Sequence, residues 1–128
     1  MIVAGIGCRA GTSAPDIEAA ITAALKDVAR TDARLDLIAT VDGKAQEVGI
    51  ADAARARGIR LVIVPRHDLE VAAAHAVTRS PRVLALTGLS SVAEAAALAA
   101  AGPNARLLAP RVAVGSATCA IAIGGDAT

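Results

Sequence analysis

Short apolar runs alternate along this chain with longer segments in which apolar residues recur every three or four positions. The runs cover residues 1–5, 35–41 and 61–64, and polar residues are nearly absent from them. Strands of a parallel sheet that is covered by helices on both faces have this pattern. We therefore predict a parallel sheet built from these runs, with the intervening segments as helices.

The clearest helix lies between the first two runs. Its apolar residues share one helix face: Ile17, Ala20, Ile21, Ala24, Leu25 and Val28. The sequence Ser13-Ala14-Pro15-Asp16 predicts its start, with serine as the cap and proline in the first turn. We expect a second helix from about residue 44 to 57, ended by Gly58, and a third from about 68 to 77.

In the last third of the chain, Ser91-Val92-Ala93-Glu94 predicts a capping box for an alanine-rich helix that stops at Gly102. Residues 107–108 and 117–123 are predicted strands, and the loop before the last one is short enough for a hairpin. Residues 82–87 fit a short strand or an irregular connection. The fold class is therefore α/β. We expect a single three-layer α/β/α domain over residues 1–128, with a mostly parallel sheet of about five strands that a late hairpin would make mixed.

Composition narrows the range of partners. The chain has no Phe, Tyr or Trp, and its formal net charge is +1. Nucleic acid is usually held by aromatic stacking and by a basic surface, so we expect no nucleic-acid partner. No apolar run is long enough for a membrane helix, and the N-terminus has no signal-peptide pattern. With two cysteines and no disulfide framework, we expect a cytoplasmic protein without membrane contact.

Candidate chemistry lies in the stretch GIGCRAGTS, residues 5–13, between the first run and the first helix. Ligands of open parallel α/β sheets bind at the carboxyl ends of the strands. Glycine lets backbone approach a ligand, and the first N–H groups of a helix favour an anion. Arginine and hydroxyl groups add donors that bind carboxylate or phosphate. The candidate binding residues are Gly7, Cys8, Arg9, Gly11, Thr12 and Ser13.

The second run ends in a polar segment that belongs to the same edge of the predicted sheet. Thr40 lies near the end of the run and is a candidate for orienting a ligand, Asp42 follows the run, and Lys44 adds a second cation near the first loop. Glu47 lies one helical turn further on. Asp42 and Glu47 are candidates for moving a proton. In the alternative interpretation, Asp42 only caps a helix, Lys44 and Glu47 are solvated, and the glycines form a tight turn.

Neither the thiols nor the imidazoles predict a metal site. Cys8 could be a nucleophile whose pKa is lowered by Arg9 and a helix N-terminus, or a small packed thiol, which we favour. Cys119, in an apolar run, is expected to be buried. His67 and His75 lack the spacing of metal ligands, so we expect no metal and no cofactor.

A nucleotide-binding alternative rests on Gly5-x-Gly7-x-x-x-Gly11, a loose form of the dinucleotide fingerprint. Its spacing differs by one residue from the common form. The acidic residue Asp42 also lies farther along than that fingerprint requires.

Four segments resemble a small cobalamin-biosynthesis family made up of CobE and the C-terminal domain of CbiG. They are residues 5–13, residues 39–44 with Glu47 and Gly49, Gly88 with residues 92–98, and residues 120–122. The resemblance adds Gly88 to the binding candidates. The chain departs from the family at Val48, where proline is frequent, and at Arg111, where lysine is common.

The resemblance implies a protein that binds a corrinoid or precorrin intermediate, as a carrier or as an accessory to a ring-modifying step. Whole CbiG proteins open a lactone ring on a corrin precursor, so hydrolase chemistry with Asp42 or Glu47 as general base is one implied activity. The other hypothesis is an interaction module that docks on a partner enzyme of the pathway. A homodimer is also compatible with the alanine-rich helix faces.

Overall fold

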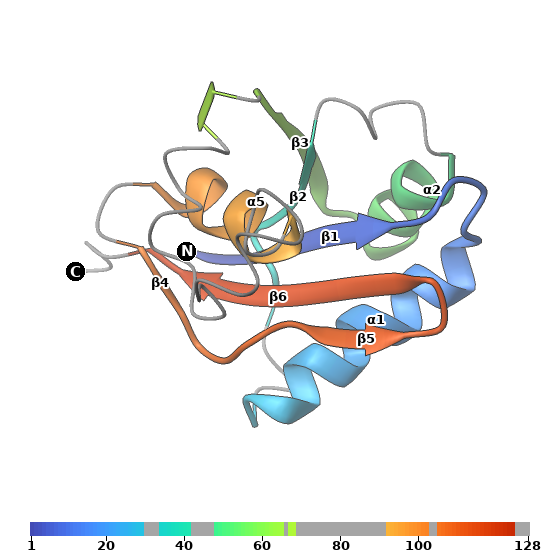
Figure 1. The fold of residues 1–128 in the computed structure, drawn as a ribbon, viewed down its shortest axis with the longest axis horizontal. Coiled ribbons are helices and arrows are strands. Elements are labelled where there is room, and N and C mark those ends of the chain that lie inside the picture. Colours follow the sequence, from blue (N-terminus) through green and yellow to red (C-terminus); the bar gives the residue numbers. More distant parts are fainter. Residues whose placement is uncertain (30–33, 42–47, 66, 69–91, 103–104, 125–128) are drawn as a thin grey trace, which may run out of the picture.

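The computed structural model describes residues 1–29, 34–41, 48–65, 67–68, 92–102 and 105–124. Within these ranges the chain forms one sheet with helices on both faces (Figure 1). The elements in chain order are β1 (Ile2–Cys8), α1 (Ala14–Asp27), β2 (Leu37–Val41), α2 (Val48–Arg57), β3 (Arg60–Val64), α5 (Val92–Ala101), β4 (Arg106–Leu107), β5 (Val112–Val114) and β6 (Ala117–Ile123).

The six strands in the described ranges form a mixed sheet in the order β3-β2-β1-β6-β4, with β5 also paired to β6. β1, β2 and β3 are parallel, as the three apolar runs predict. β6 is antiparallel to β1, β4 and β5. The two predicted late strands do pair antiparallel, as β4 and β6. The tight turn at Gly115–Ser116, where Gly115 has a φ of 59°, joins β6 to a further strand, β5, and not directly to β4. The sequence left open whether the sheet is mixed, and it did not predict β5.

The helices divide between the two faces of the sheet and give the predicted three layers. α1 and α2 cover one face, where Ile17, Ile21 and Ile50 pack on Ile6 and Ile38. α5 covers the other face and packs its alanines on β1, β2 and β6. The α/β class is therefore confirmed.

The predicted helix boundaries agree with the structure where the two can be compared. Ser13 caps α1, and the buried residues of α1 come from the predicted apolar face. α2 ends just before Gly58 and α5 just before Gly102. These glycines have positive φ angles of 66° and 97°, the conformation that commonly ends a helix. Three predicted segments lie outside the described residues: the first turn of the second helix at 44–47, the third helix beyond Asp68, and residues 82–87.

Glu94 has a long-range partner that the expected capping box does not include. Its side chain is fully buried, and Oε2 accepts a hydrogen bond of 2.9 Å from the backbone N–H of Arg111. β4 and β5 both pair with β6, and Arg111 lies in the connection between them. The carboxylate therefore fastens this connection to the first turn of α5. Ser91, the other half of the expected box, lies outside the described residues.

Across the described ranges, no helix combines the length and the apolar character that crossing a bilayer requires.

Candidate functional site

The strand at the candidate site is longer than the sequence predicted. β1 continues to Cys8, so Gly5 and Gly7 lie inside the strand and not in a loop. A Cβ at Gly5 would overlap the carbonyl oxygen of Ala93 and lie 2.7 Å from the amide nitrogen of Ala97. A Cβ at Gly7 would lie 2.8 Å from Thr118 Oγ1. These two glycines allow neighbouring elements to approach β1, which corrects our placement of Gly7 in a ligand-binding loop.

The turn that follows the strand depends on the third glycine. The backbone N–H of Thr12 donates to the carbonyl oxygen of Arg9 at 3.2 Å, and Gly11 has a φ of 80°. A β-turn with positive φ at its third residue is the type II turn, which favours glycine there. Gly11 therefore reverses the chain between Arg9 and the start of α1.

Arg9 is exposed, but its backbone is bound on both sides. Its N–H donates to the carbonyl oxygen of Ser116 at 3.1 Å, and its carbonyl oxygen also accepts from Thr12 Oγ1 at 2.7 Å. The hydroxyls of Thr12 and Ser116 lie 2.7 Å apart. The turn between β5 and β6 therefore belongs to this edge of the molecule, and Figure 1 shows it beside the loop that leaves β1.

Sequence reasoning missed Ser116 as a member of the site. The serine is separated from Thr12 by 104 positions and lies beside the loop because β6 pairs with β1 along the whole strand, from Ile2 with Ile123 to Cys8 with Ala117. The predicted hairpin was the available signal. It could not indicate the neighbour of the last strand, because local patterns do not encode strand order.

The N-termini of α1, α2 and α5 converge at this edge. Ser13 Oγ accepts a 3.4 Å hydrogen bond from the backbone N–H of Asp16. Gly49, in the first turn of α2, lies against the backbone from Thr12 to Ala14, so α2 begins beside the start of α1. On the other face, the first residues of α5 lie next to Gly7. Helix N-termini carry partial positive charge, so this edge favours an anion, while the exposed carboxylate of Asp16 reduces the effect.

The structure gives two of the predicted binding hydroxyls internal partners. Thr40 is fully buried in β2, and its Oγ1 donates to the carbonyl oxygen of Ile6 at 3.0 Å. Thr12 is 6% exposed and binds Arg9 and Ser116. Both hydroxyls therefore stabilise the edge and offer no free surface to a ligand, which corrects our view of Thr40 as a ligand-orienting group.

Four further candidates lie outside the described residues: Asp42, Lys44, Glu47 and Gly88. The two described residues that flank the segment 42–47 are Val41, the last residue of β2, and Val48, the first of α2. Because α2 begins beside Ser13, the chain enters this helix at the same edge as Arg9. Val48 itself is 69% exposed there.

The two thiols occupy different environments. Cys8 is half-buried at the end of β1 and packs against the core beneath α1. Cys119 is buried as predicted, and burial raises its pKa to about 12, although the charge of Arg57 acts in the opposite direction. Among the described residues, no three His, Cys, Asp or Glu side chains are grouped to hold a metal ion. His67 is exposed, and His75 lies outside those residues.

The loose dinucleotide fingerprint does not form a phosphate loop. Two of its three glycines, Gly5 and Gly7, are buried within β1 and pack against α5 and β6. A pyrophosphate would need backbone N–H groups that are not already part of a sheet. The geometry therefore argues against the nucleotide alternative.

Comparison with known proteins agrees with this architecture. Residues 2–122 match the family described as cobalamin synthesis G C-terminus. Protein CobE from Sinorhizobium sp is 35% identical over 127 residues, which cover 99% of this chain and 81% of the relative.

Solved structures extend the comparison. Cobalamin biosynthesis protein chiG from Agrobacterium tumefaciens str. C58 is 44% identical, with a TM-score of 0.78 over 98% of this chain and 100% of that one. A crystal structure of CobE, a protein from the cobalamin (vitamin B12) biosynthetic pathway, is 36% identical, with a TM-score of 0.82 over 95% of this chain and 89% of that one. A putative cobalamin biosynthesis protein G homolog from Sulfolobus solfataricus, 24% identical with a TM-score of 0.66, shares the fold over 96% of this chain and 36% of its own. This chain therefore belongs to the cobalamin synthesis G C-terminus family, which includes CobE, and is a cobalamin biosynthesis protein.

Proposed function

We propose that this protein binds a corrinoid intermediate by its carboxylate arms at the edge where β1 ends. The observation that carries the proposal is Arg9, an exposed cation whose backbone N–H and C=O are both held by hydrogen bonds. The backbone of Arg9 is therefore held in place, and its guanidinium extends from that position toward solvent. Membership in a cobalamin-biosynthesis family supplies the class of ligand.

The chemistry of the ligand matches the chemistry of this edge. Corrin precursors carry acetate and propionate arms, so they are polyanions with charges around a flat ring. A guanidinium binds a carboxylate through two parallel hydrogen bonds, and the start of α1 adds partial positive charge. Lys44, four positions before Val48 in the sequence, is proposed as a second cation for another arm. Ser13, exposed at the start of α1, is proposed as an orienting hydroxyl.

The macrocycle itself has no aromatic partner in this chain, which contains no Phe, Tyr or Trp. The ring face can therefore rest only on aliphatic side chains or backbone. This favours a protein that holds the ring by its charged rim, as a carrier or an accessory to a ring-modifying enzyme. If the chain itself opens a lactone, Asp42 or Glu47 is the proposed general base toward water.

Retention of a coloured corrinoid tests the proposal directly. Purified protein is mixed with cobyrinic acid, whose arms are free carboxylates, and separately with cobinamide, whose arms are amides, and each mixture is passed through a gel-filtration column. We expect cobyrinic acid to co-elute with the protein and cobinamide not to. Without aromatic residues the protein absorbs almost nothing in the near ultraviolet, so the corrin spectrum measures bound ligand directly.

Charge reversal at Arg9 provides the matched test. Arg9→Glu should weaken cobyrinic acid binding at least about tenfold, because a charged hydrogen bond contributes roughly 1.5–3 kcal/mol. Arg106→Glu is the control. Arg106 is also exposed, but it pairs with Ile123, next to Ile2, at the opposite end of the sheet. The Arg106→Glu variant should therefore bind cobyrinic acid as well as the wild-type protein does. Far-UV circular dichroism checks that both variants fold.

Each outcome decides between hypotheses. A colourless protein fraction with wild-type protein would contradict corrinoid binding and favour docking on a partner enzyme. Equal loss in both charge-reversal variants would show that Arg9 is not a specific anchor. A rise in melting temperature with a dinucleotide, and none with cobyrinic acid, would restore the nucleotide alternative.

A further inference from the structure

Arg9 is tied to residues from both ends of the chain by a directed series of hydrogen bonds. Thr12 Oγ1 donates its proton to the carbonyl oxygen of Arg9. A threonine hydroxyl has one proton, so in the 2.7 Å contact between the two hydroxyls Ser116 must be the donor. The chain of donors therefore runs from Ser116 to Thr12 to Arg9, and hydrogen bonds in such a series strengthen one another.

The same serine also holds the other side of Arg9. Its carbonyl oxygen accepts the N–H of Arg9 at 3.1 Å, so Ser116 binds Arg9 directly and through Thr12. The turn that carries Ser116 is itself placed against α1, because a Cβ at Gly115 would lie 3.8 Å from Asp16 Oδ2. Arg9 is thus fixed relative to both α1 and the hairpin of β5 and β6.

We propose that Thr12 and Ser116 are positioning residues that fix the Arg9 backbone, and with it the point from which the Arg9 guanidinium reaches the carboxylate of a corrinoid ligand. The inference rests on the proposed function and adds the hydrogen-bonded residues that set the affinity of the protein for the corrinoid. Thr12 is 6% exposed, so it acts through Arg9 and not by touching the ligand. A ligand that binds a prearranged cation does not have to order the loop, and its affinity rises accordingly.

Substitution at Thr12 separates positioning from folding. Thr12→Val keeps the size and β-branching of the side chain but removes both hydroxyl hydrogen bonds, while the backbone hydrogen bond from Thr12 to Arg9 remains possible. We expect cobyrinic acid affinity to fall about tenfold. Thr12→Ser keeps the hydroxyl and should restore most of the affinity. Ser116→Ala removes the outer donor from a partly exposed position and should give a similar but smaller loss.

The matched control makes the same chemical change at a threonine within α1. Thr22 is exposed, and its hydroxyl accepts a hydrogen bond from Arg57, far along the helix from the loop. Thr22→Val should leave cobyrinic acid affinity unchanged. Melting temperatures from circular dichroism show whether any variant loses stability as well as affinity.

A double-mutant cycle with Arg9→Gln gives the decisive readout. If Thr12 acts through Arg9, Thr12→Val should cost little further affinity once Arg9 is glutamine, since interacting residues are not additive. Equal losses in the two backgrounds would overturn the inference, as would normal affinity of Thr12→Val and Ser116→Ala beside a weakened Arg9→Gln. If the wild-type protein does not bind cobyrinic acid, the proposed function is refuted. The assignment of a corrinoid carboxylate as the ligand of Arg9 is refuted with it.

Discussion

At the scale of single residues, three glycines of GIGCRAGTS have two different physical roles. Gly5 and Gly7 have no side chain because α5 and β6 occupy the space. Gly11 has open space around it, but its φ of 80° is unfavourable for other residues. A sequence pattern cannot separate these roles, because it records only that glycine is present.

Alanine substitution should distinguish the two roles. Gly5→Ala forces a methyl group into the backbone of α5 and should destabilise the protein by about 3 kcal/mol, the upper range for overpacking. Gly11→Ala meets no atom and should cost only about 1–2 kcal/mol for the left-handed backbone. Urea unfolding followed by circular dichroism measures both.

Asparagine provides the control for this comparison. Asn tolerates positive φ better than Ala, so Gly11→Asn should be milder than Gly11→Ala. If Gly5→Ala were as mild as Gly11→Ala, close contact between α5 and β1 would not be the reason for glycine at position 5.

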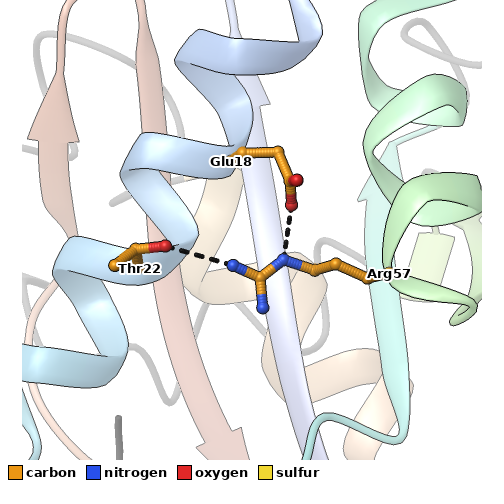
Figure 2. A network of polar contacts seen from close by, with 3 residues as sticks. All are labelled: Glu18, Thr22 and Arg57. Atoms are coloured by element: carbon orange, nitrogen blue, oxygen red, sulfur yellow. Dashed lines mark hydrogen bonds and ion pairs between the residues drawn. The ribbon is translucent and has the colours of Figure 1, made fainter.

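At the scale of elements, α1 and α2 are joined by one arginine. Arg57, in the last turn of α2, donates from Nε to Glu18 Oε1 at 2.5 Å and from Nη2 to Thr22 Oγ1 at 3.1 Å. Figure 2 shows the guanidinium between these two residues of α1. Glu18 and Thr22 are four positions apart, so they lie on the same face of the helix. The planar guanidinium can reach both, which a lysine could not do with the same geometry.

Loss of this link should have a modest effect on stability. The side chains of Arg57 and Glu18 are 25% and 35% exposed, so solvent screens the pair, and we expect Arg57→Ala to cost about 1 kcal/mol. Arg55→Ala is the matched control, because Arg55 pairs with Asp52 within α2 and is 76% exposed. It should change the free energy of unfolding by only a few tenths of a kcal/mol. Equal effects in urea unfolding would contradict the link between helices.

At the scale of the whole molecule, small side chains set how closely the layers approach. α5 buries mostly alanine, and it faces Gly5 and Gly7 across the sheet surface. The chain has no aromatic residues to fill the core. On this side of the sheet, packing therefore depends on the short distance between the backbones of α5 and β1. One buried group, the Cys119 thiol beneath α1, links the stability of this core to pH.

Stability should fall in alkaline solution because of Cys119. Its pKa is about 12 in the folded protein against 9.0 for an ordinary thiol, so above about pH 9 the unfolded chain loses a proton that the folded chain keeps. Cys119 then favours unfolding by up to about 1.4 kcal/mol for each pH unit between these two pKa values, and has no such effect below pH 9. Urea unfolding at pH 8 and pH 10.5 should show a smaller decrease for Cys119→Ala than for wild type. Identical decreases would show that the thiol is not protected by burial.

Much of the fold and part of the candidate site could be predicted from sequence. Periodicity placed α1 and its buried face, and Ser13, Gly58 and Gly102 marked helix ends correctly because capping is local chemistry. The same local logic located Arg9 and Ser13 at the edge of the sheet. It failed for Thr40, whose hydroxyl binds the neighbouring strand, and for Gly7, whose space is taken by Thr118.

The sequence by itself determined most of the described elements, the absence of aromatic packing and the presence of a cation between the first strand and the first helix, because these depend on residues close together in the chain. Only the tertiary structure decided that β6 lies beside β1 and brings Ser116 to Arg9. The same is true of the hydrogen bond from the backbone N–H of Arg111 to the carboxylate of Glu94. The physical reason is that strand order and contacts between distant residues result from packing the whole core, which no local pattern specifies.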